Sequence, residues 1–213
     1  MRDFPLFTTE HGAAGLVLRE IPYKGIAYVT IHDTLQPKAL LQDCVEFCKL
    51  AGAEKVYATG HAILEDYPLF TKVLKMQQLS ESLPQSDAML FPVTEKTAEQ
   101  WRMLYNEKMR DIPNASTMTR QDMDQLLTRG AGYFVHRNGE LLGIGIASGD
   151  MVESVIAAKT GMGETVLLAL CSALSSDTVS LEVASTNTPA MRLYQRLGFQ
   201  MTAQISCWYD VSK

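Results

Sequence analysis

Apolar and polar residues in the first eighty positions follow runs that predict three strands and two helices. Residues 15–21 and 25–31 are rich in Val, Ile and Leu and are separated by a proline, which is typical of two consecutive strands. From 37 to 51 apolar residues recur at steps of three and four, the spacing of an amphipathic helix. Residues 55–59 are predicted as a short strand and 66–75 as another helix. The predicted order is strand, strand, helix, strand, helix.

The rest of the chain has a longer pattern of the same kind. It predicts, in order, a strand over 88–93, helices over 97–109 and 120–127, strands over 132–136, 141–147 and 151–157, a helix over 161–174, a strand over 178–183, a helix that begins at Thr188-Pro189 and ends at Gly198, and a strand over 202–211. Asn138-Gly139 between the second and third of these strands is typical of a tight hairpin turn.

A polar segment separates these two patterns. Residues 80–87 include Pro84 and predict a linker, so we expect a smaller αβ half-domain over 1–83 and a larger domain over 88–213. The order of elements in the two parts agrees, and a degenerate repeat and a coincidence of common α/β patterns both account for it. The first part has Asp-Thr-Leu-Gln-Pro at 33–37 where the second has a glycine turn, so we expect no cofactor site there.

Composition and charge narrow the class of protein. The 213 residues are 46% hydrophobic and 20% charged, which is ordinary for a globular protein. A net charge of −5 argues against a general nucleic-acid binder, and no apolar run approaches the roughly 18 residues needed to span a bilayer. The first residues lack the apolar core of a secretion signal. The four cysteines show no disulfide or zinc spacing and the four histidines make no metal motif. We therefore expect a cytoplasmic protein without a membrane partner or a metal.

Two segments near the C-terminus carry candidate chemistry. Thr160-Gly161-Met162-Gly163-Glu164-Thr165 reads as a glycine turn that opens a helix and presents unpaired backbone N–H groups to an anion. Asn187 and Tyr194 lie seven residues apart and share one face of a later helix. Together they indicate a phosphate-bearing cofactor with a phenolic proton donor nearby. The simpler interpretation makes Tyr194 a core aromatic residue and Asn187 a loop or cap residue.

From Phe91 to the C-terminus the chain resembles the GNAT superfamily of acyl-CoA-dependent N-acetyltransferases. The residues that carry the resemblance are Gly161-x-Gly163 followed by Leu167-Leu168, and Asn187-x-x-Ala190-x-x-Leu193-Tyr194-x-x-Leu197-Gly198-Phe199. The resemblance implies an α/β (α+β) fold with a mixed, mostly antiparallel sheet flanked by helices. It makes 88–213 the acetyltransferase domain and 1–83 a degenerate GNAT-like half-domain.

The resemblance also implies roles for individual residues. Acetyl-CoA would be the co-substrate, Tyr194 would protonate the departing thiolate, and Glu153 is the candidate general base, with His136, Asp150 and a water relay left open. The residues expected to contact coenzyme A are Val155, Ile156, Ala157, Lys159, Thr160, Gly161, Met162, Gly163, Glu164, Thr165 and Asn187.

Three features depart from the family pattern. Ala158 stands where the family has arginine or glutamine, the loop before the glycine turn is short, and Glu164 places a carboxylate where phosphate would bind. They keep a second interpretation open, a non-catalytic acyl-CoA sensor or assembly module.

The amine acceptor is not readable from the sequence. A small-molecule amine and a peptide amine both fit, and a homodimer is compatible with the chain. Gly143-x-Gly145 looks like part of a dinucleotide fingerprint, but a strand is predicted after it where that fingerprint requires a helix.

Overall fold

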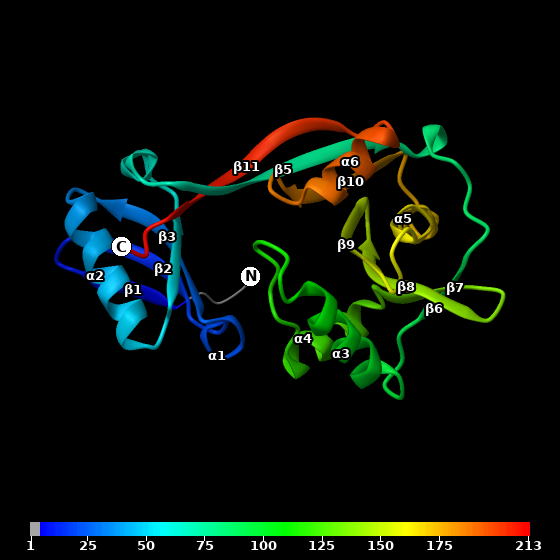
Figure 1. Cartoon of the computed structure of the whole chain (residues 1–213), viewed down its shortest axis with the longest axis horizontal. Helices are drawn as coiled ribbons and strands as arrows, with labels where there is room; N and C mark the ends of the chain where they lie inside the picture. The colour runs from blue at the N-terminus through cyan, green and yellow to red at the C-terminus, as the bar shows by residue number, and fades with distance from the viewer. Residues whose placement is uncertain (1–4) are drawn as a thin grey trace. The chain divides into compact units, whose positions relative to one another are not determined.

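A computed structural model describes residues 5–213 and divides the chain into two compact units (Figure 1). The first unit runs to Val73 and also contains Gln204–Lys213; the second is Leu74–Ala203. The division falls within strands β5 (Leu69–Leu79) and β11 (Gln200–Asp210), so each of these strands contributes residues to both units. The boundary therefore lies at different positions from the linker expected at 80–87.

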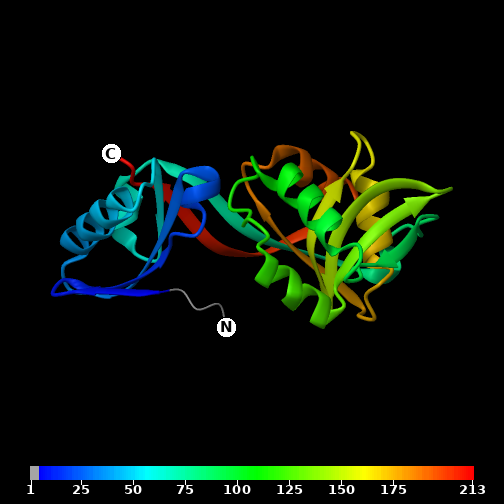
Figure 2. The same cartoon turned by 90° about the horizontal axis from the view of Figure 1, so that it is seen from below.

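The first unit is a small sheet with one long helix. Its elements are β1 (Leu6–Thr9), β2 (Gly12–Val17), α1 (Ile21–Lys24), β3 (Ile26–Thr34), α2 (Pro37–Leu50), β4 (Lys55–Thr59) and the 3₁₀ helix η1 (Ala62–Asp66). The strands β1, β2 and β3 form an antiparallel meander, β4 is parallel to β3, and β11 is antiparallel to β4. The helix α2 covers one face of this sheet (Figure 2), and its buried residues in the hydrophobic cluster there are Leu40, Leu41, Cys44 and Cys48.

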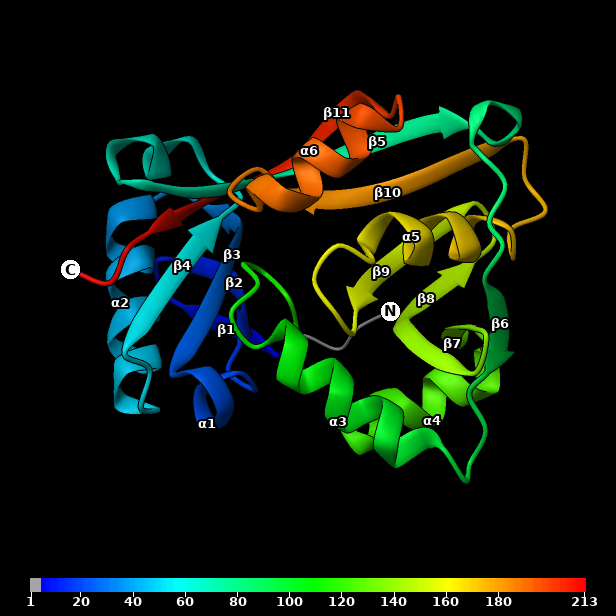
Figure 3. The same ribbon diagram turned by 45° about the vertical axis from the view of Figure 1, so that its right-hand side comes forward.

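The second unit is a seven-stranded sheet with helices on both faces. Its further elements are η2 (Ser80–Ser82), β6 (Met89–Pro92), α3 (Ala98–Met109), α4 (Arg120–Arg129), β7 (Gly132–Arg137), β8 (Glu140–Ser148), β9 (Met151–Ala157), α5 (Gly163–Cys171), β10 (Thr178–Ala184) and α6 (Thr188–Arg196). The strand order is β11-β5-β10-β9-β8-β7-β6. One hydrophobic cluster joins α3 and α4 to the sheet, and another joins α5 and α6 to it (Figure 3).

The two units repeat one order of elements. Each contains a three-stranded antiparallel meander, a helix, and a strand parallel to the last strand of the meander. After that point they differ, because β4 is followed by a 3₁₀ helix and β10 by α6. In the sheet, the last strand of the chain, β11, lies beside β4, and β5, which follows β4 in the sequence, lies beside β10.

The mixed α/β class with flanking helices is confirmed, and several element predictions need correction. The helix predicted at 66–75 is wrong, because Leu69–Leu79 forms β5. Thr71, Leu74 and Met76 are buried along that strand, where pairing with neighbouring strands outweighs local helix preference. Strand β1 and the short helix α1 were not predicted. The helix α5 is shorter than predicted at both ends.

Candidate active site

The candidate site begins where two parallel strands separate. Ser180 pairs with Met151 and Leu181 with Val152, and within the described residues no further register pair joins β9 to β10. By contrast, β3 and β4 of the first unit pair continuously over five positions, from Ile26 with Lys55 to Thr30 with Thr59. The second unit therefore has an open strand edge after Val152 and Leu181. In the first unit every residue of β4 is paired with β3, and only residues 31–34 of β3 extend past the last pair.

Beyond Val152, the backbone N–H and C=O groups of every second residue of β9 point toward this opening. The Ala158 N–H donates to the Leu142 carbonyl on β8 at 2.9 Å, and Ala157 lies opposite Gly143. In an antiparallel ladder the hydrogen-bonding direction alternates from residue to residue. The N–H and C=O groups of Val155 and Ala157 consequently point to the open edge, whereas those of Ile156 point to β8.

Glu153 occupies a β-bulge at the closed end of the opening. The β8–β9 register shifts between Ile146 and Ala147, which pair with Ser154 and Val152, so Glu153 is the extra residue. Its carboxylate accepts hydrogen bonds from Arg129 of α4 and, at 3.0 Å, from the Ser148 hydroxyl. The candidate base is thus engaged in an ion pair in this conformation.

The other end of the opening is the first turn of α5. Gly161 has φ of +87°, a conformation that strains any other residue, and a Cβ there would meet no atom within 4 Å. Met162 is the N-cap residue and its side chain makes no capping bond. The amides of Gly163, Glu164 and Thr165 are the first N–H groups of the helix, which have no intrahelical acceptor. This turn can hold an anion such as phosphate.

Charged side chains around this turn are paired with one another. Glu164 accepts a hydrogen bond from Arg196 Nη2 at 2.6 Å, so its carboxylate is turned toward α6. The ammonium group of Lys159 is paired with Glu140 of β8. Lys159, the cation expected near the phosphate site, is therefore already paired with a carboxylate of the same chain.

Asn187 and Tyr194 of α6 have different surroundings: Asn187 caps the start of the helix and Tyr194 is buried in the core. The Asn187 Oδ1 accepts a hydrogen bond from the Ala190 N–H at 3.3 Å, so Asn187 is the N-cap residue of the helix, as the simpler interpretation allows. Tyr194 is 7% exposed and packs against Phe199 in the core under α5. Burial, with a smaller contribution from Cys171, raises the pKa of the Tyr194 phenol to about 12. The phenol is accordingly protonated at neutral pH.

The other candidate bases have different surroundings. The ring of His136 on β7 lies edge-on to Phe91 on the neighbouring antiparallel strand β6, with ring centroids 5.4 Å apart. Asp150 accepts a hydrogen bond from the Ser180 hydroxyl at 3.1 Å. Sequence reasoning missed Arg129 and Ser154 altogether, because the bulge that brings them to the closed end of the opening depends on strand register.

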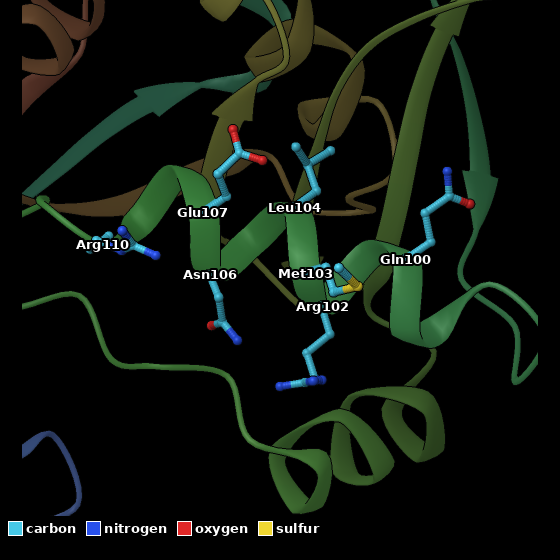
Figure 4. Close-up of a pocket in the computed structure, with 7 residues that line it drawn as sticks. All are labelled: Gln100, Arg102, Met103, Leu104, Asn106, Glu107 and Arg110. Atoms are coloured by element: carbon cyan, nitrogen blue, oxygen red, sulfur yellow. The ribbon is translucent and has the colours of Figure 1, made fainter. Parts of the chain in front are cut away.

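A separate hollow lies on α3. It has a volume of about 630 Å³ and is lined by residues of that helix and its C-cap residue (Figure 4), namely Gln100, Arg102, Met103, Leu104, Asn106, Glu107 and Arg110. Arg102 and Asn106 are already bonded to the Met118 carbonyl. The hollow is therefore part of the surface that holds the α3–α4 loop.

Comparison with known proteins agrees with this geometry. Residues 156–209, from the end of β9 to β11, match the family described as FR47-like protein. A GCN5-related N-acetyltransferase from Sphaerobacter thermophilus superposes with a TM-score of 0.58 at 14% identity, over 93% of this chain and 75% of that one. The chain has the GNAT fold. The resemblance found in the sequence is thereby confirmed at the level of the fold.

Two further structures share the GNAT fold of this chain. A functionally unknown conserved protein from Staphylococcus epidermidis has a TM-score of 0.59 at 12% identity, over 99% of this chain and 94% of that one. A tandem GNAT protein from the clavulanic acid biosynthesis pathway has a TM-score of 0.52 at 13% identity, over 94% and 78% of the two chains. No curated protein matches the sequence.

Within residues 5–213, no three His, Cys, Asp or Glu side chains are grouped so that they could share a metal ion. Every helix in the same range is too short or too polar to traverse a lipid bilayer.

Proposed function

We propose that this protein transfers an acetyl group from acetyl-CoA to an amine by direct attack in a ternary complex. The observation that carries the proposal is the separation of β9 from β10 after Val152 and Leu181. From Val152 to Ala157 the strand advances five residues, or about 17 Å at about 3.3 Å each. An extended pantetheine arm fits such an edge, with its amides bonded to Val155 and Ala157 and its phosphates at the first turn of α5.

The first unit supports a single site per chain. All five residues of its β4 are paired with β3, and its equivalent helix α2 begins with Pro37, which has no N–H to donate. We infer that this unit, the GNAT-like half-domain expected from the sequence, completes the protein without binding acetyl-CoA.

The chemistry needs a proton donor and a proton acceptor. The amine nitrogen attacks the thioester carbonyl carbon, the C–N bond forms and the C–S bond breaks. The thiolate takes a proton from the Tyr194 hydroxyl, which burial keeps protonated. Glu153 takes the proton of the amine once its ion pair with Arg129 opens, either directly or through water.

A second function is favoured by that same ion pair. If Glu153 stays bonded to Arg129 and Ser148, the site binds acyl-CoA without turning it over and acts as a sensor. Turnover across a panel of small amines and peptides separates the two functions, because a sensor binds acetyl-CoA and releases no free thiol. We propose an amine acceptor, a small molecule or a peptide, and a cytoplasmic location, where the four free cysteines stay reduced.

The experiment that tests the binding step is a thermal melt with and without acetyl-CoA. At about 100 times the dissociation constant the ligand adds about 2.7 kcal/mol, which raises the Tm of a chain this size by about 5 to 10 °C. Gly161→Val should abolish that rise. Gly139→Val is the matched control, because Gly139 has φ of +81° and open space around its Cβ position but lies in a hairpin turn. Absence of a rise in the unaltered protein would rule out the proposed co-substrate.

A further inference from the structure

Ser154 carries a buried hydroxyl that has no hydrogen-bond partner among residues 5–213. The residue is 8% exposed, and its Oγ atom makes no hydrogen bond within the described part of the chain. It pairs across the ladder with Ile146 and lies two residues before Ile156, and both of these belong to the hydrophobic cluster under α3 and α4. A buried hydroxyl in apolar surroundings is unfavourable unless something bonds to it.

A second buried serine on the neighbouring strand shows the contrast. Ser180 is fully buried on β10, and its hydroxyl accepts from Gln77 Nε2 at 2.9 Å and donates to Asp150 Oδ2 at 3.1 Å. Residues of the described chain thus bond to the hydroxyl of Ser180, and none of them bonds to that of Ser154. Ser154 is the one that lies at the candidate site.

The position of Ser154 decides which part of a ligand it can reach. It follows the bulge at Glu153, at the closed end of the opening between β9 and β10. An arm anchored at the first turn of α5 and extended along Ala157 and Val155 ends at this point. The end of acetyl-CoA opposite its phosphates is the acyl group. Solvent does not reach the Oγ atom, so the opening must widen slightly when the acyl group enters.

We propose that the Ser154 hydroxyl donates a hydrogen bond to the carbonyl oxygen of the bound acyl group. The inference rests on the proposed function and goes beyond it, because it assigns the recognition of the acyl group and distinguishes acylated from free coenzyme A. The same bond strengthens as the amine attacks, since negative charge then develops on the carbonyl oxygen. Ser154 is therefore a catalytic residue for the acyl transfer.

Calorimetric titration of acetyl-CoA and of free coenzyme A tests the assignment. Ser154→Ala should weaken the binding of acetyl-CoA by about 3- to 10-fold, the effect of one lost hydrogen bond, and leave that of free coenzyme A unchanged. Ser180→Ala is the matched control: it should lower the Tm and leave the ratio of the two affinities as in the unaltered protein. Ser154→Cys, which keeps a weak donor, should fall between serine and alanine.

Two readouts can overturn the assignment. A Ser154→Ala protein with an unchanged ratio of the two affinities would show that the hydroxyl does not touch the acyl group. The Tm of Ser154→Ala without ligand should equal or exceed that of the unaltered protein, and a fall as large as that of Ser180→Ala would show a partner inside the fold. If the unaltered protein bound neither acetyl-CoA nor coenzyme A, the proposed function would fail together with this inference. A failure of the Ser154 assignment alone leaves coenzyme A binding intact.

Discussion

Arg196 in the last turn of α6 donates a hydrogen bond of 2.6 Å to the carboxylate of Glu164 in the first turn of α5. Without this pair, a free carboxylate would stand beside the amides proposed to bind phosphate. Both side chains are substantially exposed, so the pair contributes at most about 1 kcal/mol to the free energy of unfolding. We expect the pair to matter more for the binding of an anionic ligand than for folding.

Removing the arginine should therefore weaken acetyl-CoA binding. We expect Arg196→Ala to lower the affinity by about 3- to 10-fold, because the uncompensated charge of Glu164 repels phosphate at close range. The double variant Arg196→Ala/Glu164→Gln should recover most of the loss, and titration calorimetry measures both. Equal affinities for the single variant and the unaltered protein would show that phosphate binds elsewhere.

Tyr194 should affect turnover and not binding. Tyr194→Phe keeps the ring in the core beside Phe199 and removes only the proton donor. We expect turnover of acetyl-CoA to fall by about 10²- to 10⁴-fold, with the dissociation constant for acetyl-CoA nearly unchanged. The assay measures release of free thiol with any amine from the panel that is acetylated. Full turnover in this variant would remove the phenol from the mechanism.

Stability should decline in alkaline solution. Burial raises the pKa of the Cys48 thiol from 9.0 to about 11, those of Cys44 and Cys171 to about 12, and that of the Tyr194 phenol from 10.0 to about 12. A raised pKa means that the folded state holds its proton more tightly than the unfolded state, so this stability is complete below about pH 9 and is lost as the pH rises to about 12.

Urea midpoints between pH 8 and 11.5 measure this decline. Each pKa unit corresponds to about 1.4 kcal/mol, so Tyr194 alone accounts for at most roughly 3 kcal/mol. In Tyr194→Phe, the urea midpoint should fall less steeply with pH above pH 10. Between pH 9 and 10 the decline should be unchanged, because it comes from the thiols. A curve of the same steepness in both proteins would show that the phenol is not desolvated.

The fragment 88–213 should not fold cooperatively on its own. It lacks β5, which lies between β11 and β10 in the sheet, and its loss would leave two strand edges without their neighbour. Gln77, which bonds Ser180, would be lost with it. The longer fragment 69–213 restores β5 and serves as the control. A sharp thermal transition for 88–213 in circular dichroism would show that the domain expected from the sequence is independent.

The glycines of Gly143-x-Gly145 should be required for packing. A Cβ on Gly145 would lie 2.3 Å from Leu170 Cδ1 of α5 and 2.6 Å from the Ser154 carbonyl oxygen, closer than real contacts allow. We expect Gly145→Ala to destabilise the protein by about 1 to 3 kcal/mol through overpacking. Gly130→Ala is the control for the added methyl group, because open space surrounds its Cβ position, although its own φ of +60° adds strain. A urea midpoint for Gly145→Ala above that of Gly130→Ala would contradict this explanation.

The sequence by itself determined most elements of the second unit. Residues whose local pattern and tertiary position agree were predicted well. The Asn138-Gly139 hairpin adopts positive φ at both residues, and the strands predicted over 132–136, 141–147 and 151–157 form as β7, β8 and β9. The glycine turn and the Asn187-to-Phe199 segment also pointed to the GNAT fold, through their resemblance to motifs of that superfamily.

Only the tertiary structure decided the parts that depend on strand pairing. Leu69–Leu79 is a strand because β10 and β11 lie on either side of it, and neither neighbour is close to it in sequence. The same dependence hides the separation of β9 from β10, the bulge at Glu153 and the unpartnered hydroxyl of Ser154. Register between distant strands is set by the packing of whole faces against their helices, and no local pattern of residues encodes it.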